Sequence, residues 1–179
     1  MSLRSLLLIV FALFASVRAE AADFKVATVE FTRAINEIEE GKHAQARLDR
    51  MLQGKRAEIE QLEADIRALD SEYQTKKAML NDASRQEYEQ RLYEMQARYQ
   101  QLYTQADYDM QTAYASAMES LLAGLKVTAE EIGKERGLDL VLEVSSGTVL
   151  YSKSGTDITD EVIKRYNASH GGSTAAPKK

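Results

Sequence analysis

The sequence contains no cysteine and no tryptophan, and its single proline is Pro177. The absence of cysteine excludes a disulfide framework, a thiol nucleophile, zinc sites with cysteine ligands and iron–sulfur clusters. Because residues 1–176 lack proline, the strongest helix breaker is missing there, and long helices are favoured. The net charge of -5 argues against non-specific nucleic-acid binding, which needs a surplus of lysine and arginine.

Motifs that support catalysis or cofactor binding are also missing. The sequence has no G-x-G-x-x-G, no G-x-x-x-x-G-K-[ST] and no G-x-S-x-G. Glu40 and His43 have the E-x-x-H spacing of di-iron sites, but such sites need a second copy and two further glutamates. We therefore predict that the protein is not an enzyme, that it binds no cofactor or metal, and that His43 is a solvated helix residue.

The first 21 residues have the form of a secretory signal. Arg4 precedes an apolar run over 6–15, and Ala19 and Ala21 give the A-x-A pattern that signal peptidase accepts. The apolar run is too short to cross a bilayer core, which needs about 20 residues. We predict that residues 1–21 are cleaved and that the protein acts in the periplasm; the alternative is an uncleaved anchor.

Short strand patterns flank a long helical region. Residues 24–31 and 138–144 are rich in apolar and β-branched side chains. A turn at 145–147 leads into a third candidate strand over 148–152, which we expect to form a hairpin with 138–144. A closing helix with Thr159 as its N-cap follows, and the tail over 168–179 has the composition of a disordered segment.

Between the strands, the periodicity predicts two long helices over 41–80 and 85–136. Apolar residues recur every seven positions along two seams in each arm, which is the heptad pattern of a coiled coil. A break at 81–83 separates the arms, and Ser84 with Glu87 is expected to form a capping box at the start of the second helix. Because the connection is so short, the two helices must run antiparallel.

The position of the turn determines which residues face each other. With residues 82 and 83 at the tip, facing positions have residue numbers that add up to 164 or 165. The oppositely charged seam residues Lys55 and Asp109 meet this condition, and we predict that they pair and fix the register. Gly41 and Gly124 also meet it; they are expected either to mark a bend near the base or to be tolerated helix glycines.

The order of these elements resembles the Skp family, also called OmpH, of periplasmic holdase chaperones. The likeness covers residues 23–167 and is carried by FKVATV at 24–29, GLDLVL at 137–142 and ITDEVI at 158–163, the last of which looks like the family's closing DIT segment. It implies an α+β fold dominated by α. A coiled-coil hairpin over 41–133 would project as a tentacle from a strand-containing oligomerisation body over 22–40 and 134–167.

The resemblance also implies partners. In that family three chains pair their strands, and the tentacles surround a cavity that holds unfolded outer-membrane β-barrel precursors without ATP. A homotrimer is therefore expected, whereas the sequence itself indicates only that the chain is not a monomer. The family's best-known members are basic and this chain is acidic, so no basic site is carried over and direct lipid binding is not expected.

A different class of function stays open as an alternative. The protein could instead be a coiled-coil structural or adaptor protein of the cell envelope, whose hairpin docks one folded partner. The type of partner distinguishes the two classes, because a holdase binds unfolded chains of unrelated sequence.

Tyrosine is concentrated in the hairpin, where seven of the nine lie between residues 73 and 114. Tyr73, Tyr88 and Tyr99 fall on the seams and are expected in the core. Residues off the seam or beside a stutter in the heptads are the candidate client contacts: Tyr93, Tyr103, Tyr108, Met110 and Tyr114. Tyrosine and methionine adapt to many apolar shapes, which suits the holding of unfolded chains. The alternative is that these side chains pack locally against their i,i+4 neighbours.

Overall fold

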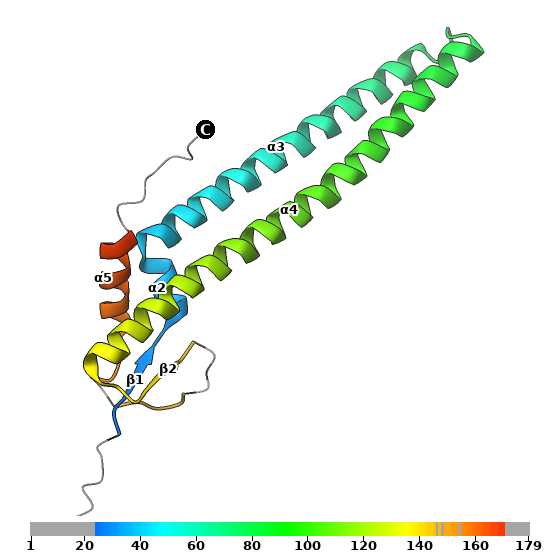
Figure 1. Ribbon diagram of the computed structural model, residues 1–179. Helices are drawn as coiled ribbons and strands as arrows, with labels where there is room; N and C mark the ends of the chain where they lie inside the picture. Colours follow the sequence, from blue (N-terminus) through cyan, green and yellow to red (C-terminus); the bar gives the residue numbers. More distant parts are fainter. Residues whose placement is uncertain (1–23, 146, 148, 154, 171–179) are drawn as a thin grey trace, which may run out of the picture.

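A long helical hairpin projects from a small body of strands and short helices (Figure 1). The computed structural model describes residues 24–145, 147, 149–153 and 155–170; the predicted signal over 1–21 lies outside these residues. The elements are β1 (Val26–Val29), α2 (Phe31–Glu37), α3 (Glu39–Lys76), α4 (Asp82–Arg136), β2 (Leu140–Glu143) and α5 (Thr159–His170). The predicted α+β fold dominated by α, with a hairpin on a strand-containing body, is confirmed.

Helices α3 and α4 form the hairpin and have 38 and 55 residues. At 1.5 Å per residue they are about 57 and about 82 Å long. The start of α4 differs from the predicted capping box, because Asn81 is the N-cap and its side chain accepts a hydrogen bond from Ser84 N at 2.9 Å. Asparagine is among the best N-cap residues, and Ser84 lies inside the helix. At the other end, Gly137 adopts the left-handed conformation with φ 59° and stops α4 as predicted.

The two arms pack along one narrow seam. Its buried side chains toward the distal end are Leu62, Leu69, Tyr73 and Ala106. Side-chain contacts between the arms reinforce the distal end, where the Tyr73 ring stacks on the Tyr88 ring with a centroid distance of 5.5 Å. Because only two helices share this seam, their outward faces stay in contact with solvent.

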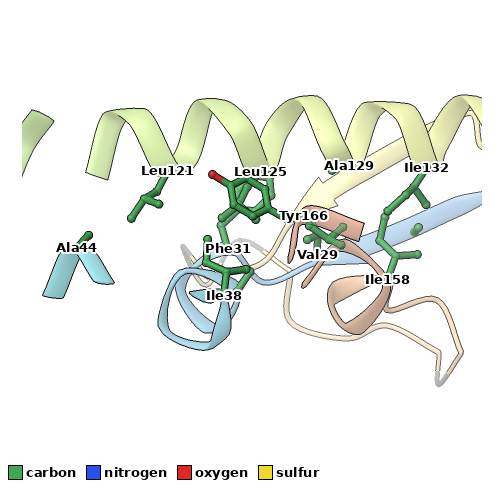
Figure 2. Packing of buried hydrophobic residues seen from close by; sticks show 13 residues of the cluster. Val29, Phe31, Ile38, Ala44, Leu121, Leu125, Ala129, Ile132, Ile158 and Tyr166 are labelled. Atoms are coloured by element: carbon green, nitrogen blue, oxygen red, sulfur yellow. The ribbon is translucent and has the colours of Figure 1, made fainter. Parts of the chain in front are cut away.

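The main core lies in the body, where the base of the hairpin meets the short elements. The cluster consists of Ala27, Val29, Phe31, Ala34, Ile38, Ala44, Leu121, Leu125, Ala129, Ile132, Ile158, Val162 and Tyr166. Figure 2 shows the α4 members of this cluster pointing toward α2 and α5. Residues from both ends of the chain therefore bury the proximal part of α4.

The sheet has two parallel strands, with β1 and β2 paired in register from Val26↔Leu140 to Val29↔Glu143. The second edge of β1 is taken by the segment before α5, because Thr28 N donates to Thr156 O at 2.9 Å and Ile158 N donates to Thr28 O at 2.8 Å. This segment, residues 156–158, leads directly into α5.

The predicted strand hairpin between 138–144 and 148–152 is wrong. Among the described residues of 149–152 none is in a strand, and Leu150 and Tyr151 are 95% and 85% exposed. The turn itself forms, since Gly147 N donates to Val144 O at 3.1 Å. Nothing in the described part of the chain covers the side chains of Leu150 and Tyr151, and residues 156–158 pair with β1 instead.

Two glycines at the base of the hairpin permit close packing. A Cβ on Gly41 would lie 1.8 Å from the carbonyl oxygen of Ile35, where α2 folds back on α3. A Cβ on Gly124 would lie 2.8 Å from the ring of Tyr166, where α5 crosses α4. The glycines thus mark contacts with α2 and α5, which neither expected interpretation included. The pattern of the sequence also did not predict the break at Ile38 that separates α2 from α3.

Helix α5 corrects two further expectations. Thr159 is its first helical residue and not its N-cap; its hydroxyl donates to Asp157 at 2.5 Å and accepts from Glu30 N at 2.9 Å. The helix continues through His170, so residues 168–170 of the predicted disordered tail are helical, and the rest of that tail lies outside the described residues. In the last turn of α5 the His170 ring stacks on the Tyr166 ring, with a centroid distance of 4.1 Å.

The glycine contacts predict a difference between two substitutions in α3. Gly41→Ala should lower the free energy of unfolding by about 1–3 kcal/mol or more, because the new methyl group meets backbone atoms. Gly54→Ala is the matched control: no atom lies within 4 Å of its added Cβ, and alanine should raise stability by about 0.5–1 kcal/mol. Urea unfolding followed by circular dichroism measures both, and equal effects would contradict the packing described.

Candidate functional site

Three tyrosines serve the fold through their hydroxyl groups. Each donates to a carboxylate on another part of the chain: Tyr73 to Glu89 at 2.6 Å, Tyr88 to Glu72 at 2.8 Å and Tyr166 to Glu40 at 2.5 Å. The hydrogen bond to Glu89 raises the pKa of Tyr73, and that to Glu72 raises the pKa of Tyr88. Burial first, and then Glu40, raise the pKa of Tyr166. These side chains cross-link the molecule at both ends of the hairpin.

Four other tyrosines, all on α4, have no such structural partner. Tyr93, Tyr103, Tyr108 and Tyr114 are 73%, 59%, 65% and 55% exposed. Within the described part of the chain, none of their hydroxyls forms a hydrogen bond. The structure therefore places the predicted contact tyrosines in solvent, while Met110 is half-buried.

Four of the five candidate residues fall into two groups on the hairpin. Met110 follows Tyr103 by seven residues and precedes Tyr114 by four, spacings that put them on one face of α4. Tyr93 instead lines a shallow hollow of about 370 Å³, together with Ile66, Gln96, Ala97, Tyr99 and Gln100. The sequence does not reveal this hollow, because Ile66 lines it from the other arm.

The chain around Tyr103, Tyr108 and Tyr114 is nearly free of charge. Residues 99–125 of α4 contain no lysine or arginine and three acidic residues: Asp107, Asp109 and Glu119. Apolar surface, tyrosine hydroxyls and glutamine amides therefore dominate this part of α4. Such a surface contacts uncharged chain segments without leaving a charge unpaired.

The predicted charged pair lies next to this surface. Lys55 Nζ donates to Asp109 Oδ2 at 2.7 Å across the hairpin, and Gln105 Nε2 donates to Asp109 Oδ1 at 2.7 Å. The Lys55 bond, followed by the Gln105 bond, lowers the pKa of the Asp109 carboxyl. The same contact raises the pKa of Lys55. The structure thus brings together the two residues that the heptad register placed opposite each other.

A second apolar surface lies on the body. A hollow of about 430 Å³ is lined mainly by α4 and residues 138–143; its lining includes the apolar Phe31, Ala129 and Val141 and charged side chains such as Lys126 and Glu130. Beside it Leu140 and Leu142 of β2 are 41% and 37% exposed. No strand of the described residues pairs with the outer edge of β2.

The described residues also lack two other kinds of site. They contain no group of three or more histidine, aspartate or glutamate side chains placed to hold a metal ion. No helix among them combines the length and apolar character needed to span a bilayer.

The fold and its exposed side chains define a class of protein in which one long helical hairpin projects from a small α+β body. The sequence model of the outer membrane protein family (OmpH-like) matches residues 25–166. The chain therefore belongs to the OmpH-like family, as the sequence analysis predicted.

A solved structure shows the same fold. It is a Caulobacter crescentus protein provisionally named an outer membrane chaperone (OmpH-like), with 17% sequence identity and a TM-score of 0.77. The alignment covers 87% of this chain and 90% of that protein. No curated protein sequence matches this chain.

The Lys55–Asp109 contact predicts a specific dependence of stability on pH. The contact lowers the Asp109 pKa below its ordinary 3.8, so the carboxylate stabilises the fold above that value and loses its effect as pH falls through the lowered pKa. Asp109→Asn should therefore reduce the loss of thermal stability in acid. Asp107→Asn, two residues away and in contact with Gln111, is the matched control. If the thermal stability of Asp109→Asn falls with pH as steeply as that of the wild type, the pair contributes nothing to the stability of the fold.

Proposed function

We propose that the protein is an ATP-independent holdase chaperone of the periplasm. It binds unfolded precursors of outer-membrane β-barrel proteins and prevents their aggregation during outer-membrane assembly. Membership of the OmpH-like family supports this proposal. The observation that carries it is the set of exposed tyrosines on α4, whose side chains take no part in the fold.

The chemistry of this surface suits the holding of unfolded chains. Tyrosine offers a large, rigid, amphipathic side chain at a small cost in conformational entropy, and methionine adapts its shape. Each contact is weak, and many simultaneous contacts give a useful affinity. The net charge of -5 favours solubility of the protein and its complexes.

A homotrimer formed through the strand region is part of this proposal. The outer edge of β2 has no partner strand among the described residues, and β2 and the chain after it carry four exposed apolar side chains: Leu140, Leu142, Leu150 and Tyr151. Exposed strand edges and apolar patches of this kind are typical of surfaces that pair with another chain. Three hairpins would then surround a shared cavity for the client. No direct contact with lipid is proposed.

The holdase proposal predicts the effect of removing the exposed tyrosines. The mature chain should suppress light scattering when a urea-unfolded outer-membrane β-barrel protein is diluted without ATP. The triple variant Tyr93→Ser, Tyr103→Ser, Tyr108→Ser should need several times more protein for the same suppression, because it loses apolar contact area. Its circular dichroism and thermal unfolding should match those of the wild type, since these tyrosines do not pack in the core.

Met79→Ser is the matched control, because Met79 is 80% exposed at the tip of the hairpin, away from this surface. It should keep full activity. A triple variant that suppresses aggregation as well as the wild type would overturn the role of the tyrosines. Unsuppressed aggregation by the well-folded wild-type oligomer would instead favour the adaptor function, in which the hairpin docks one folded partner.

The proposed trimer predicts that a charged side chain introduced into β2 prevents assembly. Light scattering coupled to size exclusion should give three times the chain mass for the wild type. Leu142→Glu should lower that mass, because the carboxylate would be buried at the strand interface. Gln101→Glu places the same charge on the exposed surface of α4 and should leave the mass unchanged. A trimer that survives Leu142→Glu would exclude β2 from the interface.

A further inference from the structure

The hollow beside Tyr93 contains two side-chain amides that the fold does not use. Gln96 and Gln100 lie one turn apart on α4 and both line the hollow. Six other glutamine amides of the hairpin donate to a carboxylate four residues away, whereas those of Gln53, Gln86 and Gln101 have no partner among the described residues; the six are Gln45, Gln61, Gln74, Gln90, Gln105 and Gln111. The amides of Gln96 and Gln100 have no hydrogen-bond partner among the residues that the structure describes.

The sequence explains this difference. The positions four residues before Gln96 and four residues after Gln100 are Leu92 and Thr104, so no carboxylate is within reach along the helix. The side chains that line the hollow are all uncharged. Each amide therefore presents both a donor and an acceptor at the edge of an apolar depression.

The spacing of the two amides matches an extended polypeptide. Four residues of α-helix rise about 6 Å. In an extended chain, peptide groups that point to the same side recur every second residue, at about 6.6 Å. A segment lying along α4 can therefore present alternate peptide groups to both amides.

We propose that Gln96 and Gln100 bind the backbone of an extended client segment while one of its apolar side chains fills the hollow. The inference rests on the proposed holdase function and names what this part of its surface recognises. An amide pairs with a peptide N–H or C=O whatever the neighbouring side chains are. Recognition of the backbone would let one site serve clients of unrelated sequence.

The test combines a change in the protein with a change in the ligand. The probe is a labelled, capped eight-residue peptide of alternating valine and threonine with one central tyrosine. In a second peptide, the backbone nitrogens of the two residues that flank the tyrosine are methylated. This removes two N–H donors that point to the same side of an extended chain and keeps every side chain. Fluorescence anisotropy measures the binding of both to the full mature chain.

Methylation should weaken binding to the wild type by about fivefold or more, the effect of losing one or two hydrogen bonds. In the variant Gln96→Ala, Gln100→Ala the two peptides should bind within about twofold of each other, because the partner amides are gone. Gln86→Ala, Gln101→Ala removes two exposed amides of α4 outside the hollow and should keep the wild-type difference. Comparing the two peptides on each protein cancels any effect of methylation on the free peptide.

An equal loss on methylation in the wild type and in Gln96→Ala, Gln100→Ala would overturn the inference. No loss in the wild type, together with displacement of the peptide by an octyl-chain detergent, would identify an acyl chain as the occupant and would also overturn it. Failure of the wild type to suppress aggregation of an unfolded β-barrel protein is a separate result, which would refute the proposed holdase function.

Discussion

The packing of Tyr166 against both arms holds the hairpin to the body. Its ring lies on Gly124 of α4, and its hydroxyl donates to Glu40 of α3 at 2.5 Å. The side chain is 2% exposed, and α5 contributes it from near the end of the described chain. Because two helices alone share only a narrow seam, this contact at the base determines how the arms leave the body.

Beyond the base, the hairpin separates the residues that stabilise it from those left exposed to solvent. Tyr73 and Tyr88 stack between the arms and bind carboxylates, whereas Tyr93 and Tyr103 point into solvent with free hydroxyls among the described residues. A two-helix structure makes this division possible, since every position off the seam is available for contact. The same geometry leaves the Gln96 and Gln100 amides free beside an apolar hollow.

Much of the hairpin could be predicted because heptad periodicity is local. The seams, the antiparallel arms, the facing of Lys55 and Asp109 and the stop at Gly137 all follow from spacing along the chain. The N-cap of α4 is Asn81 and not the predicted Ser84, because both are good N-cap residues and only the turn geometry selects between them. The hollow escaped prediction because Ile66 reaches it from the facing arm.

The sequence by itself determined the long helices, their pairing and which tyrosines of α4 are exposed, since each depends on the repeat of residues along one helix. The tertiary structure decided the rest. It paired β1 with β2 and with residues 156–158, left Leu150 unpaired within the described chain, and required glycine at positions 41 and 124. These features depend on atoms that are brought together from both ends of the chain, and no local pattern encodes such distances.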